Sequence, residues 1–443
     1  MNSPTLAMKA TIVGAGPAGL LLAHYLLARD YRVEIYDRRP DPRTIDLDQR
    51  RSFPISLQER GRSALKGIPG LEDAIASHSV FCKGTVMHSK KGDRDIPRKN
   101  EVMTVDRNQL VLTLLEQLTA KYAQPELTIR FDCVCDRIDD QQQTVGFQTA
   151  EGEDFSVRYD RLIGADGARS QVRDQLSTRY GLSSELNYVP DAYKSIFLAR
   201  KKPEQGVEFA PDRIHATNLG KDCRIILAPL PGDVLHGAFI FAGPNPLATF
   251  TTKEEVLDYF ETNIPTFRSV LSTEEAEALL QRPTARLLTV KCEQFHYGDR
   301  ILLIGDAAHA VSPSIGQGCN SALQDIAIIN RLLDRYQDDW AQAIAQFSKE
   351  RVTDAHALIA LSDYSFPRSK RLIPEFLLRL KLGRKLNRWF PQWFKPFVFD
   401  LVLDSDMSYS EILELSQGWI NKVKRSNERL NQRLAFSNEG ATD

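Results

Sequence analysis

The sequence has few of the features that mark specialised classes of protein. Among its 443 residues there are only six cysteines, and no two of them form a CxxC pair or a metal-ligand spacing. The net charge is −1, which gives no reason to expect a nucleic acid as partner. No stretch holds the roughly 18 uncharged apolar residues that are needed to cross a bilayer. These absences predict a cytoplasmic protein with reduced thiols, no metal site and no nucleic acid partner.

The first motif that points to a ligand is rich in glycine and joins a strand to a helix. An apolar run from Lys9 to Val13 is typical of a strand, and helical periodicity follows from Ala18 to Arg29. Between them, Gly14 permits a tight turn and Gly16 lets a pyrophosphate approach the backbone, while Gly19 allows the helix to pack on the strand. The helix N-terminus offers unpaired N–H groups to the phosphates. The motif predicts a nucleotide site.

An acidic residue ends the next strand, at the distance that such a site requires. The strand runs from Arg32 to Tyr36, and Asp37 follows it, 23 residues after Gly14. A carboxylate at this place accepts hydrogen bonds from ribose hydroxyls. The combination of glycines, helix and acid favours a bound dinucleotide over a glycine-rich turn without a ligand.

Two further aspartates follow apolar strands later in the chain. Asp166 comes after the strand Arg161 to Gly164, and Asp306 comes after the strand Ile301 to Ile304. The carboxyl ends of parallel strands are where open α/β sheets place their ligands. The loop from Pro313 then enters a helix near Asn320, whose N-terminus can stabilise the negative charge of a reduced flavin. The order of the three motifs predicts a chain that wraps one extended FAD molecule.

The remaining pattern divides the chain into segments. Strand and helix signals alternate up to about residue 180, which indicates a doubly wound parallel sheet interrupted by a β-meander whose first strand is expected from Leu127 to Ile138. Longer strand-rich segments follow, and the end of the chain has helical patterns. We expect an α/β protein whose segments are residues 1–180 (FAD-binding domain), 181–297 (substrate-binding β-sheet domain), 298–362 (return to the FAD-binding domain) and 363–443 (helical region with a polar tail from about Ser437).

The motifs resemble those of the FAD-dependent aromatic hydroxylases, the group related to p-hydroxybenzoate hydroxylase. Over nearly its whole length the chain resembles the kynurenine 3-monooxygenase family in particular. The resemblance implies a Rossmann-type FAD-binding domain, a mostly antiparallel β-sheet that faces the substrate, and C-terminal helices. Beyond the FAD motifs, it is carried by residues 51–65, 87–89, 105–110, 295–297, 389–396 and 408–411.

The resemblance also assigns cofactor residues. Arg107 matches the arginine that contacts FAD, and Ser56, Cys135 and Gln171 fall at positions that touch it through the backbone. The motifs and the resemblance together predict FAD-binding residues Gly14, Gly16, Pro17, Ala18, Gly19, Asp37, Arg38, Ser56, Arg107, Cys135, Asp166, Gln171, Asp306, Pro313, Gly316, Gly318, Cys319 and Asn320.

The substrate pocket departs from the family pattern. Kynurenine enzymes hold the amino-acid head group with an arginine, two tyrosines and an asparagine, and the four corresponding positions here carry Thr85, Arg98, Val398 and Ser365. Losing the bidentate partner of a carboxylate costs on the order of 2–5 kcal/mol. We therefore expect a substrate other than kynurenine. Arg98 either replaces the lost cation or is a solvated loop arginine beside Lys99, and the second interpretation is favoured.

The chemistry that the resemblance implies is centred on the flavin. NADPH or NADH reduces FAD, O2 forms a flavin C4a-hydroperoxide, and an OH group is transferred to an aromatic or polycyclic small molecule. No side chain is assigned as catalytic, and one dinucleotide fingerprint implies transient binding of the nicotinamide. The alternatives are kynurenine 3-monooxygenase itself, a flavin-dependent reductase or dehydrogenase of the same fold, and, less favoured, a halogenase or a silent FAD-binding scaffold.

Three other features have rival interpretations. His309 is expected to support the loop near the cofactor rather than act as a base, and Cys319 is expected to face flavin through its backbone rather than act as a nucleophile. Nine basic residues lie among Leu, Phe and Trp from Arg368 to Lys395. This pattern suits either peripheral membrane contact through residues 368–400 or a lid over the active site.

Overall fold

A six-stranded sheet forms one half of the molecule. The computed structural model describes residues 8–44, 53–89, 91–220, 223–369 and 371–439. The sheet has the order β18-β19-β10-β1-β2-β6, and all its neighbours are parallel except the edge pair β18 and β19. Its strands are β1 (Lys9–Val13), β2 (Arg32–Tyr36), β6 (Leu127–Arg130), β10 (Arg161–Gly164), β18 (His296–Tyr297) and β19 (Ile301–Leu303). The four inner strands are short and largely buried, as a parallel sheet covered on both faces requires.

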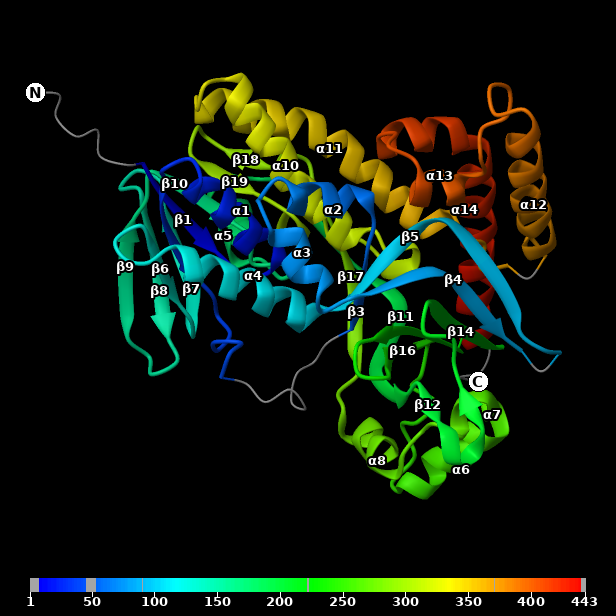
Figure 1. Cartoon of the computed structure of the whole chain (residues 1–443). Helices are drawn as coiled ribbons and strands as arrows, with labels where there is room; N and C mark the ends of the chain where they lie inside the picture. Colours follow the sequence, from blue (N-terminus) through cyan, green and yellow to red (C-terminus); the bar gives the residue numbers. More distant parts are fainter. Residues whose placement is uncertain (1–7, 45–52, 90, 221–222, 370, 440–443) are drawn as a thin grey trace, which may run out of the picture.

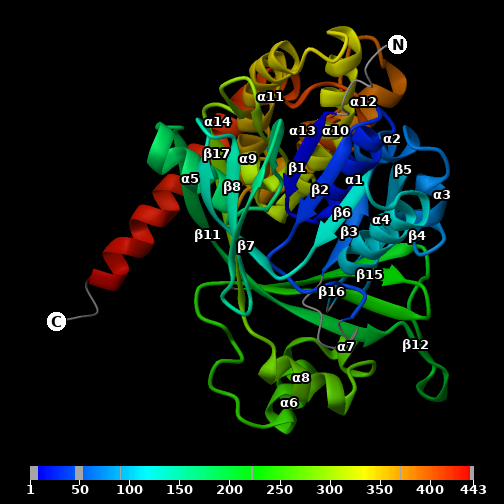
Figure 2. The same cartoon turned by 90° about the vertical axis from the view of Figure 1, so that its left-hand side faces the viewer.

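Helices from distant parts of the sequence cover this sheet (Figures 1 and 2). Helix α1 follows β1 and is apolar on nearly all sides, because it is enclosed by the sheet and by neighbouring helices. The helices of this half are α1 (Pro17–Leu27), α2 (Glu59–Lys66), α3 (Leu71–Ala76), α4 (Arg107–Lys121), α5 (Gln171–Tyr180), α9 (Asp306–His309), α10 (Gly318–Arg335) and α11 (Trp340–Tyr364). The largest described core cluster lies between them and the sheet.

The predicted strand from Leu127 to Ile138 is wrong, because the structure contains two strands there. Asp132 has a positive φ of 58°, a conformation that aspartate tolerates, and it turns the chain after β6. The meander that follows is a separate three-stranded sheet of β7 (Cys133–Asp139), β8 (Thr144–Thr149) and β9 (Asp154–Arg158). Cys133 and Cys135 are both buried on β7, where residues two apart lie on the same face of the strand.

The second large sheet has eight strands in the order β17-β11-β16-β15-β14-β4-β5-β3. It is antiparallel except where β14 runs parallel to β4. Its strands are β3 (Pro54–Leu57), β4 (Val80–His88), β5 (Arg94–Asp106), β11 (Ser184–Ala199), β14 (Arg213–Gly220), β15 (Cys223–Leu230), β16 (Val234–Ala242) and β17 (Ala285–Cys292). Three of the eight come from residues 54–106, so this sheet is built from more of the chain than residues 181–297. The segment boundaries given above therefore stay a proposal.

A small helical layer covers the outer part of the second sheet. It contains α6 (Lys253–Asn263), α7 (Pro265–Arg268) and α8 (Thr273–Gln281), and a short hairpin of β12 (Lys201–Lys202) and β13 (Val207–Glu208) lies beside it. Thr252 and Glu255 form a capping box that begins α6. Phe239, Phe260 and Phe267 belong to a core cluster of this layer that is separate from the first.

The C-terminal helices form a third group beside α11. They are α12 (Ile373–Trp389), α13 (Val398–Asp404) and α14 (Tyr409–Glu439), and α14 packs along α11. Phe376, Trp419 and Leu361 are buried in their own cluster. The helix continues past the start of the polar tail that we expected at Ser437, and the last four residues lie outside the described part of the chain. Among the described residues, no helix is both long and apolar enough to cross a membrane.

Candidate functional site

The glycine-rich loop has the tight geometry that its sequence predicts. Gly14 has φ +111°, and a Cβ on it would lie 2.4 Å from the carbonyl oxygen of Ala165. A Cβ on Gly19 would lie 2.0 Å from the carbonyl oxygen of Gly14, so the helix approaches the loop as closely as the motif requires. Gly16, in contrast, faces open space, because a Cβ there would have no described atom within 4 Å. The backbone at Gly16 is therefore the part of the loop that a ligand can reach.

The N-terminus of the helix that follows can bind an anion. Pro17 is the first residue of α1, where its missing N–H costs nothing, and the first turn carries no acidic side chain. The partial positive charge of the helix N-terminus is therefore not compensated by the helix itself. Ala18 lies in this first turn.

Asp37 ties the end of β2 to the glycine-rich loop. Its Oδ2 accepts a hydrogen bond of 2.6 Å from the N–H of Ala15, and its Oδ1 accepts one of 2.8 Å from the N–H of Arg39. The carboxylate is thus held in place by two backbone groups, with further lone pairs available for ribose hydroxyls. This arrangement fixes the acid at the mouth of the cleft.

Asp166 presents a buried oxygen that lacks a partner. Its Oδ2 accepts hydrogen bonds from the N–H groups of Gln171, at 2.6 Å, and Val172, at 3.2 Å, at the start of α5. Its Oδ1 is buried and has no hydrogen-bond partner among the described residues. Burial raises the pKa of this carboxyl, and the hydrogen bonds from Ser170 and Val172 oppose the shift. A buried acceptor without a donor costs free energy that a hydroxyl-bearing ligand can recover.

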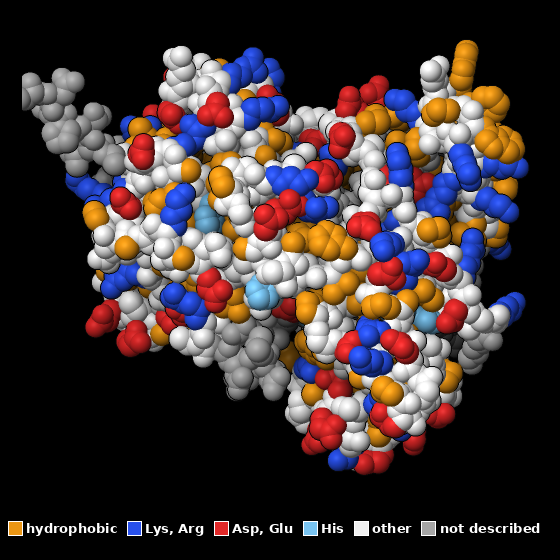
Figure 3. Space-filling model, in the orientation of Figure 1, with side chains coloured by type: hydrophobic (Ala, Val, Ile, Leu, Met, Phe, Trp, Pro, Cys, Tyr) orange, Lys and Arg blue, Asp and Glu red, His pale blue; other side chains and the backbone are white. Residues whose placement is uncertain are grey.

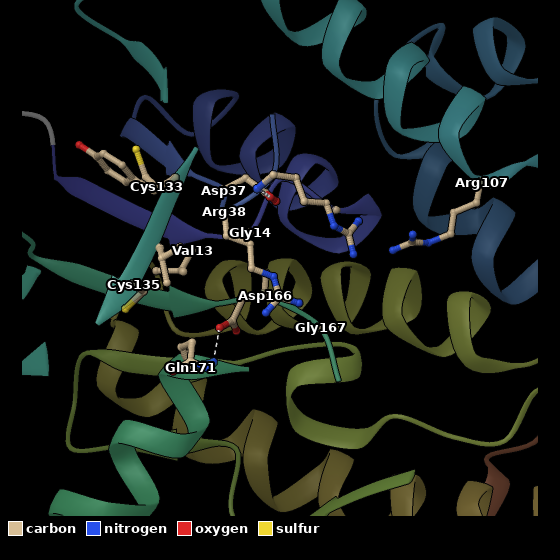
Figure 4. A pocket seen from close by; sticks show the side chains of 15 residues that line it. Val13, Gly14, Asp37, Arg38, Arg107, Cys133, Cys135, Asp166, Gly167 and Gln171 are labelled. Carbon is tan, nitrogen blue, oxygen red and sulfur yellow. Dashed lines mark hydrogen bonds between the residues drawn. The ribbon is translucent and has the colours of Figure 1, made fainter. Parts of the chain in front are cut away.

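These residues line one cleft (Figure 4). Arg107, the first residue of α4, extends into it from the side opposite Asp37 and Asp166. Burial and the charge of Arg107 lower the pKa of Arg39, which also lines the cleft and was not expected there. The positive charges of Arg38, Arg39 and Arg107 can pair with the negative charges of a diphosphate. The lining residues are Val13, Gly14, Gly16, Tyr36, Asp37, Arg38, Arg39, Arg107, Cys133, Val134, Cys135, Ala165, Asp166, Gly167 and Gln171.

A second carboxylate continues the site toward α10. Asp306 begins α9 directly after Gly305, and its side chain has an accessible surface, with no hydrogen bond or ion pair to another described residue. The carboxyl is nevertheless surrounded by protein on most sides, and this partial loss of hydration raises its pKa, while the charge of Arg107 opposes that rise. Asp306 and Arg107 therefore interact electrostatically across the site. An accessible carboxylate without a protein partner suits the hydroxyls of a ribityl chain.

The loop before α10 is held by the side chain of Asn320. Its Oδ1 accepts a hydrogen bond of 2.7 Å from the N–H of Gln58, and its Nδ2 donates to the carbonyl oxygens of Ser56, at 2.9 Å, and Gly316, at 3.0 Å. This amide joins β3 to the loop, so only the backbone N–H of Asn320 can point at a ligand. Gly316 has φ +66° and follows the short 3-10 turn Pro313–Ile315, and α10 then begins at Gly318.

Cys319 lies in the first turn of α10 and is half-buried. Burial, together with the charge of Asp306, raises the pKa of its thiol to about 12, while the charge of Arg107 opposes this rise. The thiol is therefore protonated at neutral pH and is a poor nucleophile. This agrees with the interpretation that Cys319 contributes its backbone.

His309 belongs to a buried network and not to the cleft. Its Nε2 lies 2.7 Å from Oδ2 of Asp325, which also accepts from the N–H of Gly305 at 2.9 Å. Oδ1 of Asp325 accepts from Nε of Arg351 at 2.8 Å, and Arg351 also pairs with Asp354 at 2.6 Å. The imidazole thus supports the turn that carries Asp306. Asp325 and Arg351 were not predicted from the sequence, because both stand at ordinary helical positions with no motif around them.

The four substrate positions lie on the second large sheet, at the end of α11 and on the C-terminal helices. Thr85 is half-buried within β4, between β5 and β14. Ser365 ends α11, where its carbonyl oxygen accepts a hydrogen bond from Nε1 of Trp419 at 3.0 Å, and its side chain is fully buried. Val398 is buried in the core of the C-terminal helices.

Arg98 is not the solvated loop residue that we expected. It stands within β5 and is half-buried. Burial lowers the pKa of its guanidinium, whereas the nearby carboxylates of Asp404 and Asp400, on α13, raise it. A polar cavity of about 300 Å³ lies between these elements, lined by Gln58, Glu59, Arg60, Arg62, Asn100, Glu101, Val102, Leu403, Asp404, Ser405 and Asp406.

Comparisons with known proteins agree with this geometry. Residues 7–362 match the model of a family described as FAD binding domain. A kynurenine 3-monooxygenase of Legionella pneumophila (strain Corby) is 31% identical over 429 residues, which cover 93% of this chain and 92% of that enzyme. The kynurenine 3-monooxygenase of Sus scrofa is 27% identical over 419 residues, covering 93% and 87%.

Solved structures share the fold. A 2-methyl-3-hydroxypyridine-5-carboxylic acid oxygenase superposes with a TM-score of 0.67 at 20% identity, over 81% of this chain and 91% of that one. HpxO of Klebsiella pneumoniae, in a complex with FAD and uric acid, superposes with a TM-score of 0.64 at 18% identity, over 86% and 95%. The expected α/β fold of the aromatic hydroxylases is thereby confirmed.

Proposed function

Because the chain belongs to the FAD binding domain family and is an FAD-dependent aromatic monooxygenase similar to kynurenine 3-monooxygenase, we propose that it uses NADPH or NADH and O2 to hydroxylate an aromatic small molecule other than kynurenine. The cofactor FAD follows from the family. The electron donor, the site of oxygen activation and the substrate are the parts that we infer.

The residues of the cleft fit the cofactor. The backbone at Gly16 and the N-terminus of α1 receive the diphosphate, beside Arg38 and Arg107. Asp37 takes the ribose hydroxyls, and the unpaired Oδ1 of Asp166 accepts from a hydroxyl donor. These roles use groups that the protein itself leaves accessible or without a partner. When bound, FAD supplies the oxidation and reduction chemistry that activates O2 at its C4a position.

At the flavin end, the protein contributes electrostatics and orientation. The N–H groups of Gly318, Cys319 and Asn320 open α10, and their partial positive charge favours an anionic reduced ring. Asp325 holds the N–H of Gly305 and so fixes the direction in which Asp306 points. No side chain is needed as an acid or base in this scheme.

The observation that carries the choice of substrate is the identity of Thr85. A threonine hydroxyl cannot form the two parallel N–H···O bonds with which arginine holds a carboxylate. Ser365 and Val398, at two of the other three positions, are buried in protein and offer no cation. These residues favour a substrate without the amino-acid head group of kynurenine.

Kynurenine itself is the second candidate. It is favoured by the 31% identity to an enzyme of that name over 93% of the chain, and by Arg98, whose guanidinium lies beside the C-terminal helices. In this interpretation Arg98 replaces the missing arginine. The carboxylates of Asp400 and Asp404 argue against it, because their negative charges lie near Arg98 and would repel a substrate carboxylate there.

Anaerobic stopped-flow reduction of the purified flavoprotein by NADPH, with and without L-kynurenine, separates the two candidates. We expect no acceleration by kynurenine and strong acceleration by one member of a panel of phenolic and polycyclic compounds. Consumption of O2 coupled to a hydroxylated product then distinguishes a monooxygenase from a reductase. Strong acceleration by kynurenine would overturn our assignment of the substrate class, and the cofactor site would be unaffected.

A further inference from the structure

Helix α12 and the turn after it expose more apolar side chains than a solvated surface requires. In Figure 3, hydrophobic and basic side chains gather at the right-hand edge, where Figure 1 places α12. Only Phe376 of this helix is buried. We call the exposed residues of 377–395 the α12 surface; its large hydrophobic members are Leu377, Leu378, Leu382, Trp389, Phe390, Trp393 and Phe394. Apolar surface of this kind marks an interaction site.

The helix has two opposite faces. With 100° between successive residues, Leu378, Leu382 and Trp389 share one side, and Phe376 and Gly383 share the other. Phe376 packs against Phe397 and Trp419, with ring centroids 5.7 and 6.0 Å away, and a Cβ on Gly383 would lie 3.3 Å from Phe397. The packed side is therefore complete, and the apolar stripe points away from the protein.

The turn after α12 presents two more aromatic rings in a fixed position. The backbone N–H groups of Trp393 and Phe394 both donate to the carbonyl oxygen of Phe390, and Nδ2 of Asn387 donates to the carbonyl oxygen of Phe394 at 2.7 Å. Trp393 is 83% exposed and Trp389 is 60% exposed. Tryptophan, like tyrosine, is enriched at the boundary between water and lipid.

The same segment is strongly basic. Residues 371–395 hold seven lysines and arginines and one acid, although the whole chain has a net charge of −1. Arg384 pairs with Asp400 and Arg379 with Glu375. The other five cations have no ion pair among the described residues; they are Arg371, Lys381, Lys385, Arg388 and Lys395. Lys381 and Arg388 lie together along one side of the apolar stripe, and both are exposed.

We propose that the α12 surface docks peripherally on an anionic lipid bilayer, with the apolar stripe and Trp393 in the headgroup region. The unpaired cations can interact with the negatively charged headgroups of such a bilayer, and the neighbouring aromatic and leucine side chains can enter its apolar region. A second copy of this chain would bring like charges together. A lid is not supported either, because the stripe faces outward from α13 and α14 at the edge of the molecule. This inference is independent of the substrate and of turnover.

The test is flotation of the FAD-loaded protein with vesicles. One set contains phosphatidylcholine alone, and the other contains phosphatidylcholine with about one third phosphatidylglycerol. We expect the protein to float with the anionic vesicles only, and the bound fraction to fall as salt rises, because salt screens the charges. Each cation near such a surface contributes about five-fold to partitioning, so Lys381→Glu with Arg388→Glu is expected to weaken binding by at least about 25-fold.

Matched control variants distinguish a specific effect of the α12 surface on vesicle binding from the effects of a changed net charge or of misfolding. Arg158 and Lys349 are exposed cations on β9 and α11 without an ion pair among the described residues, so Arg158→Glu with Lys349→Glu makes the same change in net charge elsewhere. Trp393→Ala is compared with Tyr188→Ala, which removes a half-exposed ring from β11. Every variant must retain its flavin absorbance. We expect only the two variants of the α12 surface, Lys381→Glu with Arg388→Glu and Trp393→Ala, to lose binding to the anionic vesicles.

Three results would overturn the proposal. One is equal binding, or none, with both kinds of vesicle. Another is an equal loss of binding in the control variants. The third is a concentration-dependent dimer, seen by sedimentation without lipid, that Trp393→Ala dissociates, because a second copy would then cover this surface.

Discussion

The phenol of Tyr409 donates a hydrogen bond of 2.8 Å to Oε1 of Gln317, which joins the first residue of α14 to the loop before α10. Both side chains are fully buried. Nε2 of Gln317 donates in turn to Oε1 of Gln58 at 2.7 Å, and the N–H of Gln58 donates to Oδ1 of Asn320. The C-terminal helix is therefore linked by side-chain hydrogen bonds to the segment that we assign to the flavin.

Tyr409→Phe tests this link. The variant leaves Oε1 of Gln317 buried without its donor, and we expect a loss of about 1–3 kcal/mol in the free energy of unfolding together with weaker retention of FAD. Tyr122→Phe is the control, because that hydroxyl donates no hydrogen bond to any described residue. Denaturant unfolding with and without added FAD gives both quantities. If both variants behave alike, the hydrogen bond does not position the loop.

Substitutions at two glycines of the nucleotide loop should affect different properties, one the stability of the apoprotein and the other its affinity for FAD. Gly14→Ala places a methyl group 2.4 Å from the carbonyl oxygen of Ala165 at φ +111°, so we expect the apoprotein itself to be destabilised by several kcal/mol. Gly16→Ala meets no described atom within 4 Å at φ −81°, so the apoprotein should unfold as the wild type does. Its methyl group instead occupies the space that a diphosphate needs, and FAD affinity should fall at least about tenfold. Calorimetry of apoprotein and titration with FAD measure the two effects. A Gly16→Ala variant with normal affinity would contradict our placement of the diphosphate.

His215 should make stability depend on pH. Burial, together with the neighbouring His88 at 3.0 Å, lowers the pKa of this histidine from 6.5 to about 4, although the hydrogen bond to the carbonyl oxygen of Ala210, at 3.0 Å, opposes the shift. The unfolded chain therefore binds a proton at higher pH than the folded protein does. The contribution of neutral His215 is fully present above about pH 6.5 and is lost as the pH falls toward 4, by about 3 kcal/mol in total. Urea unfolding between pH 7 and pH 4.5 measures it.

The same series on His215→Gln should show a smaller fall in stability over this range. His78→Gln, which changes an exposed histidine, should keep the wild-type dependence. An unchanged slope in His215→Gln would assign the pH dependence to other groups.

The geometry that could be predicted from the sequence involves residues close together in the chain. The contacts that could not be predicted join residues that are far apart in the chain. The residues from Gly14 to Asp37 form one strand–helix–strand unit, so their spacing alone fixes their geometry. Arg351 reaches Asp325 from another helix, and Asp354 accepts a hydrogen bond from the N–H of Ser410, 56 residues later. Such contacts follow from how helices pack, and no local pattern encodes them. Likewise, alternation along β3–β5 indicates strands but not the sheet that they join.

Thr85→Arg should restore a response to kynurenine if the loss of arginine is what changed the substrate. Thr85 lies in β4 next to β5, the strand that carries Arg98, and an arginine there can pair with a carboxylate through two parallel hydrogen bonds. Such a pair contributes roughly 2–5 kcal/mol relative to an unpaired charge. We expect kynurenine to accelerate anaerobic flavin reduction by NADPH in the variant at concentrations at least about tenfold lower than in the wild type. Thr85→Gln, which is polar but not charged, is the control and should not respond. If Thr85→Arg binds FAD normally and still ignores kynurenine, position 85 does not decide the choice of substrate, and the buried residues Ser365 and Val398 become the next positions to exchange.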